Sequence, residues 1–301
     1  MTMLENFGVI SDEMHDDLTT AVREIRALGC KVVEIQLFDG KTVAEVSEAD
    51  IDRARGLLNE NGLRVSAIGS QFIKPTYVQE DAAFEQELDL LRAEIAVAKK
   101  LGAPIVRSYS FRRDDMVGLG NPTPRLPKGG DIPGHRLEAI ATKMRRAAQM
   151  CADEGLVLGL ENVRSCWGNS GHNTGRILDA VDHPALQAMW DPGNCFVSGG
   201  DPNAEGYEAV KGRVCLVHVK DAHVVNPATG LTAWDPVGKG EVGWTKQFQL
   251  LERDGYSGAL SLETHWHPKG PNGEPADKVR DSQTSFEGIR AALKEAGAAR
   301  V

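Results

Sequence analysis

Short runs of β-branched and apolar residues alternate with longer helical patterns along this chain of 301 residues, and this alternation limits the fold more than any other feature. The predicted strand and helix pairs occupy residues 7–10 and 15–28, 32–38 and 49–61, 65–70 and 82–101, 105–111 and 135–154, 156–163 and 174–181, 186–191 and 203–210, 214–221 and 244–253, and 259–264 and 284–296. Eight such units, in a chain near the ~250 residues typical of the fold, predict an α/β protein of the (β/α)8 TIM-barrel class.

An open, doubly wound sheet is the competing fold, but it needs a glycine-rich phosphate loop after an early strand. The chain has no GxGxxG or GxxxxGK(S/T) motif, so we expect a single barrel domain over residues 1–301. Two segments, at about 112–134 and 222–243, are longer than ordinary connections and follow the carboxyl end of a strand. In a barrel that end is the active face, so both segments are candidates for a lid or for contact with the substrate or another subunit. For 112–134, a disordered surface insertion is the equally weighted alternative.

The charge balance argues against a nucleic-acid-binding protein. The net charge is -9 and the pI is near 5.4, whereas a protein that binds the phosphate backbone is expected to carry a basic stripe. The five cysteines form no CxxC pair and are expected to be reduced thiols. No signal region opens the chain, and no run approaches the ~20 apolar residues of a membrane span. We therefore expect a cytoplasmic protein with a small polar substrate, and neither nucleic acid nor a membrane as partner.

Four predicted strands in the second half of the chain each deliver one potential metal ligand, namely Glu161, Asp191, His218 and Glu263. The steps between them are 30, 27 and 45 residues. The first two steps are close to the ~31 residues that each of eight units takes in an average barrel, and the long 222–243 segment explains the third. Because burying an unpaired carboxylate is costly, these groups are predicted to share one cation at the same rim.

Each of these residues alone has an ordinary structural explanation. A strand-end acid is more often a helix cap or a salt-bridge partner, and a lone histidine in an apolar strand is usually a hydrogen-bonded core residue. Their agreement with the repeat is what favours a metal site. Three carboxylates and one imidazole form an oxygen-rich set, which suits one Mn2+ ion best, with Mg2+, Co2+ and zinc as the alternatives.

Five short segments are distinctive: Leu160-Glu161-Asn162, Trp190-Asp191-Pro192-Gly193-Asn194, His218-Val219-Lys220-Asp221, the glycine-rich run 238–244, and Leu262-Glu263. With them, nearly the whole chain resembles the xylose-isomerase-like TIM-barrel superfamily of sugar isomerases, epimerases and related lyases, which also contains nucleases of the AP-endonuclease type. In the epimerase branch, the resemblance implies that Glu161, Asp191, His218 and Glu263 hold one divalent ion. It also implies that the two glutamates move protons.

We therefore expect a metal-dependent isomerase or epimerase of a sugar or keto-sugar derivative. A metal that binds the substrate carbonyl acidifies the neighbouring proton by stabilising the enediolate oxygen, so that one glutamate can remove a proton and the other can return one. The nearest alternative is a lyase or dehydratase acting on a keto-glycoside or an inosose, because it begins with the same proton abstraction. A non-catalytic sugar-binding barrel and a nuclease rank lower. Many relatives carry histidine where this chain has Asn194, and a multi-zinc nuclease needs extra histidine ligands.

Six further residues are predicted to contact the substrate: Asn194, Lys220, His265, Trp266, Arg107 and Glu34. For Glu34 and Arg107, a buried ion pair between them is no less expected than substrate contact. Trp266 is a candidate to stack on a sugar ring, with plain packing against the last helix as its alternative. No cluster of lysine and arginine marks a phosphate pocket, so an unphosphorylated carbohydrate is slightly favoured. A homo-oligomer or a partner subunit would use the two long segments.

Overall fold

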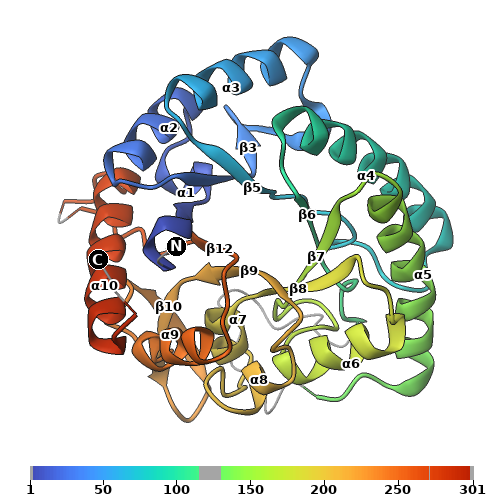
Figure 1. The fold of residues 1–301 in the computed structure, drawn as a ribbon. Helices are drawn as coiled ribbons and strands as arrows, with labels where there is room; N and C mark the ends of the chain where they lie inside the picture. Colours follow the sequence, from blue (N-terminus) through green and yellow to red (C-terminus); the bar gives the residue numbers. More distant parts are fainter. Residues whose placement is uncertain (1–2, 115–129, 271, 299–301) are drawn as a thin grey trace.

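The computed structural model describes residues 3–114, 130–270 and 272–298, and its centre is a nearly closed barrel of eight parallel strands (Figure 1). Around the barrel the strands follow the order β1, β12, β9, β8, β7, β6, β5 and β2. Their bounds are β1 (Phe7–Val9), β2 (Val32–Ile35), β5 (Arg64–Ile68), β6 (Ile105–Ser108), β7 (Val157–Glu161), β8 (Leu186–Trp190), β9 (Val214–Val219) and β12 (Ala259–Leu262). A parallel bridge from Ile10 to Glu34 joins the two end strands. The predicted fold class is confirmed.

The longer helices form a ring outside the barrel (Figure 1). They are α2 (Leu18–Ala27), α3 (Glu48–Glu60), α4 (Asp81–Leu101), α5 (Gly134–Asp153), α6 (Gly171–Val181), α9 (Trp244–Arg253) and α10 (Lys278–Ala296). Shorter helices are α1 (Ser11–Met14), α7 (Pro192–Val197) and α8 (Glu205–Glu208), with 3-10 turns η1 (Met3–Asn6) and η2 (Val43–Glu45). Gly102 ends α4 at a φ of 70°, in the left-handed conformation that glycine adopts without steric strain.

The segment 222–243 differs from the irregular loop expected there. Strands β10 (Asp221–Asn226) and β11 (Leu231–Asp235) pair antiparallel and form a hairpin. The Gly230 N–H donates to Asn226 O at 2.8 Å, and Gly230 has a φ of 67°, which closes the turn. Most of the other long segment, 112–134, lies outside the described residues, so the roles expected of it stay predictions.

Several other elements also differ in extent from the sequence prediction; for example, α10 begins six residues before the expected start at 284. The strand expected at 32–38 ends at Ile35, because β3 (Leu37–Phe38) turns away to pair with β4 (Lys41–Thr42). The helix expected at 203–210 is reduced to α8, and the unexpected helix α7 follows β8 directly. That helix begins after Asp191, whose side chain accepts a hydrogen bond from the Asn194 N–H in the manner of an N-cap.

Strands and helices share one large apolar cluster, and Ala67, Ile105, Met189 and Leu216 of the strands form a second, small one. Buried polar residues lie at the carboxyl ends of the strands. At one side of the barrel, Phe7 of β1 meets Phe248 of α9 and Phe286 of α10 edge to face, with 6.0 Å between ring centroids in both pairs. All five cysteines are free. Within the described ranges, no helix is both long enough and apolar enough to cross a membrane.

Candidate functional site

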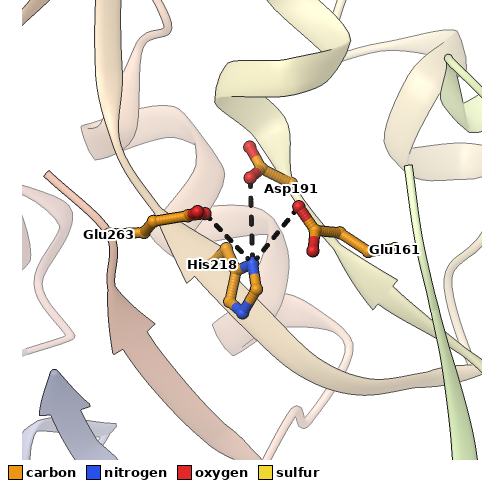
Figure 2. A group of neighbouring side chains, drawn as sticks. All are labelled: Glu161, Asp191, His218 and Glu263. Carbon is orange, nitrogen blue, oxygen red and sulfur yellow. Dashed lines mark ion pairs between the residues drawn. The ribbon is translucent and has the colours of Figure 1, made fainter. Parts of the chain in front are cut away.

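Four adjacent strands bring the four predicted metal ligands together at one end of the barrel. Glu161 is the last residue of β7, Asp191 follows β8, His218 lies in β9 and Glu263 follows β12. The Nδ1 atom of His218 lies 3.6 Å from Glu161 Oε1, 3.9 Å from Asp191 Oδ2 and 3.3 Å from Glu263 Oε2 (Figure 2). All four side chains are buried. We call these four residues the ligand cluster.

Local structure orients Asp191 before any ligand is considered. Its Oδ1 atom accepts the Asn194 N–H at 2.7 Å, so Oδ2 is the oxygen that faces His218. The buried Asn162 amide donates to Asp191 O and accepts from Asp191 N, both at 2.8 Å. Asn162 therefore ties the end of β7 to the end of β8, and it explains why an amide follows the ligand Glu161 in the sequence.

The two nitrogens of the His218 ring have different surroundings. Nε2 lies 3.0 Å from Glu34 Oε2, and this contact favours the tautomer that carries its proton on Nε2. Nδ1, Glu161 Oε2 and Asp191 Oδ2 are buried without a hydrogen bond of regular geometry, and only ion pairs with Arg107 and Lys220 hold the two oxygens. Buried polar atoms usually have a well-formed hydrogen bond in folded proteins. Three ligand-type atoms that lack one in a single cluster fit a bound cation.

Two buried cations lie beside the carboxylates of the site. The Nη1 atom of Arg107 is 3.4 Å from Glu161 Oε2 and 3.8 Å from Glu34 Oε1. The Nζ atom of Lys220 is 2.9 Å from Asp191 Oδ2 and 2.7 Å from Glu263 Oε2. Both cations therefore compensate part of the buried negative charge.

Four buried acids, Glu34, Glu161, Asp191 and Glu263, face these two cations, which leaves two negative charges when His218 is neutral. Leaving such charge uncompensated in a dry interior is unfavourable. A divalent cation has the charge that would balance the site. This charge balance supports the same conclusion as the ligand atoms that lack a regular hydrogen bond.

Without a metal ion, the site neutralises itself through protons. Burial lowers the pKa of His218, but the negative charges of Glu34 and Glu161 outweigh burial and raise the pKa to well above its usual value. Burial raises the pKa of Asp191 to about 6, against the opposing effect of Lys220. For Glu161 the effect of burial is outweighed by His218 and Arg107, which bring its pKa down to about 2. A metal ion would have to displace the His218 proton.

The structure places the other predicted substrate-binding residues at different depths. The Asn194 amide donates to Glu161 Oε1 at 3.0 Å, and His265 Nε2 lies 3.1 Å from Glu263 Oε1. Glu34, Arg107 and Lys220 are buried against the ligand cluster, as described above. Trp266 is half-buried, and no ring contact among the described residues connects it to the cluster. Substrate contact by all six residues stays a prediction.

Sequence reasoning missed two residues of this site. Glu13 in α1 accepts from the His265 N–H at 3.1 Å, and its oxygens lie 3.2 Å from His265 Nδ1 and 3.1 Å from His267 Nε2. Trp234 in β11 packs on the His265 ring, with 5.3 Å between centroids, and lies over Lys220 Nζ at 5.4 Å. An aromatic residue within the long segment after the seventh barrel strand was the available signal for Trp234. Nothing local distinguishes Glu13.

Comparisons with known proteins agree with the barrel fold. The family model "Xylose isomerase-like TIM barrel" matches residues 22–289. The "Putative hydroxypyruvate isomerase" of Mus musculus is 27% identical over 208 residues, which cover 66% of this chain and 65% of the mouse protein. The match thus spans slightly less than two thirds of that relative's length. The "L-ribulose-5-phosphate 3-epimerase UlaE" of Salmonella typhi is 23% identical over 283 residues, 92% of this chain and 90% of that protein.

A solved structure with the same fold is a xylose isomerase-like TIM barrel protein from Mycobacterium smegmatis in complex with magnesium. It superposes with a TM-score of 0.66 at 21% sequence identity, over 94% of this chain and 89% of that one. At this identity the likeness concerns the barrel itself.

Proposed function

Because the chain belongs to the xylose isomerase-like TIM-barrel family, we propose that it is a divalent-metal-dependent isomerase or epimerase of a sugar or keto-sugar derivative. The observation that carries the proposal is the ligand cluster, in which four buried groups of metal-ligand type converge and the buried acids outnumber Arg107 and Lys220 by two negative charges. The names of the mouse and Salmonella relatives describe a sugar epimerase and a related isomerase, which supports this reaction class.

The proposed cofactor is one divalent cation held by Glu161, Asp191, His218 and Glu263, with Mn2+ as first choice and Mg2+ or Co2+ as alternatives. When bound, such an ion would polarise the substrate carbonyl and stabilise negative charge on its oxygen. Oxygen atoms are three of the four donors, which supports a hard ion.

Glu161 and Glu263 are the proposed catalytic residues. They lie on opposite sides of His218 (Figure 2), so that one can take a proton from the substrate carbon and the other can return one. Arg107 Nη1, 3.4 Å from Glu161 Oε2, favours the ionised carboxylate that can accept a proton. Burial lowers the pKa of His265, but Glu263 raises it more, to about 9, so this ring holds a proton beside Glu263. An enediolate between the two proton transfers accounts for isomerisation and for epimerisation.

The first test measures the metal and the proton transfer separately. Mass spectrometry of the purified protein is expected to find about one divalent ion per chain, and the His218→Ala variant should lose it. Wild-type protein in deuterated water should then place deuterium on a carbon of one ketose from a panel. The Glu161→Gln variant should reduce this exchange by on the order of 100-fold or more, whereas Glu60→Gln on the exposed face of α3 should not.

Two results would contradict the proposal. One is a wild-type protein that stays free of metal after manganese is supplied, and the other is a Glu161→Gln variant that exchanges deuterium at the wild-type rate. Product analysis distinguishes the alternative lyase or dehydratase, because elimination yields an unsaturated product, whereas isomerisation conserves the mass of the sugar.

A further inference from the structure

Lys74 carries a positive charge that no described acid neutralises directly. Its turn connects β5 to α4, and its Nζ atom lies 3.4 Å from Tyr109 Oη and 4.6 Å from the centre of the Tyr109 ring. None of the carboxylates in residues 3–114, 130–270 and 272–298 is within ion-pairing distance of this ammonium. Burial lowers the pKa of Lys74, which reflects its partial removal from water. A desolvated ammonium without a counter-ion is available to an anionic ligand.

The neighbours of Lys74 place it on the side of the ligand cluster. Tyr109 follows β6, and two cations lie over its ring. Lys74 Nζ is 4.6 Å from the ring centroid and Arg107 Cζ is 5.5 Å from it. Arg107 in turn reaches Glu161. After burial, the attraction of Glu161 is the strongest influence on the Lys74 ammonium, and Glu263 adds to it. Tyr109 and Arg107 therefore connect Lys74 to the Glu161 side of the ligand cluster.

A strained turn holds Lys74 in this place. Ile73 is fully buried and has a φ of 57°, a conformation that is rare for a β-branched residue. The Glu87 carboxylate from α4 fixes the turn by accepting the Ile73 N–H at 3.0 Å and the Thr76 hydroxyl at 2.9 Å. Pro75 disfavours a helical backbone conformation at Lys74, the residue before it. Such strain persists only where the surroundings over-determine it, and it is concentrated at functional sites.

The charges of the other cations around the site are already matched. Arg107 contacts Glu34 and Glu161, and Lys220 contacts Asp191 and Glu263. A divalent ion together with Arg107 and Lys220 would balance the four acids Glu34, Glu161, Asp191 and Glu263, whereas Lys74 has no described acid within ion-pairing distance. A neutral sugar would leave the Lys74 charge without a partner, whereas one carrying an anionic group would compensate it.

We propose that Lys74 binds an anionic group of the substrate, a carboxylate or a phosphate, so that the substrate is a sugar acid or a sugar phosphate. This inference rests on the proposed function for the sugar, and on the environment of the ammonium for the anion. It revises the expectation of an unphosphorylated sugar, which relied on the lack of a cluster of basic residues in the sequence. One lysine on a loop is a point charge that can serve a phosphate or a carboxylate.

Binding measurements with three sugars test the proposal without requiring turnover. The probes are fructose, fructose 6-phosphate and 5-keto-D-gluconate, titrated calorimetrically into protein supplied with manganese. We expect wild type to bind one of the two anionic sugars at least tenfold more tightly than fructose, and the preferred one identifies phosphate or carboxylate. Lys74→Met should abolish this preference and leave fructose binding unchanged, and Lys74→Arg should retain part of it. Lys31→Met, at an exposed lysine with 57% of its side chain accessible, should behave as wild type.

Two outcomes overturn the assignment: a wild type that shows no preference for either anion, or a Lys74→Met variant that weakens binding of all three sugars equally. If Lys74→Met does not fold, Lys74→Gln provides the same comparison. A Lys74-dependent preference without deuterium exchange would leave the anion site standing and contradict the proposed reaction. Deuterium exchange without any preference for an anionic sugar would support the proposed reaction and contradict the anion site at Lys74.

Discussion

At the scale of single residues, the buried imidazole of His218 shows how the proposed metal site is organised. One ring nitrogen faces the ligand cluster, and the other lies 3.0 Å from Glu34 Oε2. A carboxylate in this position fixes the ring orientation and the tautomer, and makes the metal-facing nitrogen a better electron donor. Glu34 is fully buried. Its contact with His218 therefore supports a positioning role in addition to its weaker contact with Arg107.

Glu34→Gln tests this positioning role. The amide oxygen of glutamine can still accept the Nε2–H of His218, but it lacks the negative charge that raises the basicity of the ring. We expect manganese affinity to fall by about 10-fold to 100-fold, as is typical for such outer partners. Calorimetric titration of manganese measures the change, with Glu48→Gln as control because the Glu48 side chain is 75% exposed. Equal manganese affinity in wild type and Glu34→Gln would exclude the positioning role and leave Glu34 only as the ion-pair partner of Arg107.

The sequence predicts the members of the ligand cluster because they recur in phase with the strand-helix repeat. It does not predict which neighbours orient them. Glu34 and His218 are 184 residues apart, and their contact exists only because the barrel closes. Among the described residues, the lack of an acid within ion-pairing distance of Lys74 likewise depends on how the fold arranges these acids. Such information resides in three-dimensional distances, and residue type and spacing do not contain it.

At the scale of elements, helix α4 buries an acid against the loop that leads to Lys74. Glu94 is 6% exposed and accepts the Ser70 hydroxyl at 2.7 Å. Ser70 O accepts the Arg107 Nε–H at 3.0 Å. Ser70 therefore connects Glu94 to Arg107 of the site. Burial raises the pKa of Glu94 to about 7, although the Ser70 hydrogen bond lowers it. Glu94 is therefore best accommodated in its neutral form.

Glu94→Gln should stabilise the protein in a pH-dependent manner. The folded-state pKa of about 7 lies above the ordinary value of 4.5, so protonated Glu94 favours the folded state below pH 4.5. That contribution is lost as the pH rises toward 7. Glutamine stays neutral and can accept the same hydrogen bond. The variant should unfold at higher urea concentration than wild type at pH 8, by up to about 3 kcal/mol, and show little difference at pH 4.5. Equal stabilities at pH 8 would contradict the raised pKa.

The β10–β11 hairpin is the element that sequence reasoning described least well. Its segment reads as a loop because glycine, proline and charged residues interrupt the alternation that indicates a strand. The hairpin nevertheless brings Trp234 onto His265, so an aromatic residue packs beside the site from this element. The stacking of Trp266 on a sugar ring stays a prediction, and Trp234 is a second indole beside the site that sequence reasoning did not indicate.

At the scale of the whole molecule, the barrel is closed where its first two strands meet. The eight strand-helix units could be counted from the sequence, because each strand and helix has its own periodicity. The closure of the barrel could not be predicted from the sequence, because it depends on how closely the backbones of β1 and β2 approach each other. A methyl group at Gly8 would lie 2.4 Å from Val32 O, much closer than van der Waals contact permits. Gly8 thus permits the close approach that brings Glu34 toward His218.

Gly8→Ala should therefore destabilise the molecule and also weaken its metal site. The added methyl group must push β1 away from β2, which should lower the free energy of unfolding by ~1–3 kcal/mol. Gly56→Ala is the matched control, because Gly56 lies in α3 with no atom within 4 Å of the added methyl group. It should instead raise stability by about 1 kcal/mol, since alanine favours the helix. Urea unfolding and manganese titration of both variants would measure the two effects. A Gly8→Ala protein as stable as wild type, with unchanged manganese affinity, would show that the barrel relaxes at this seam without disturbing Glu34 or His218.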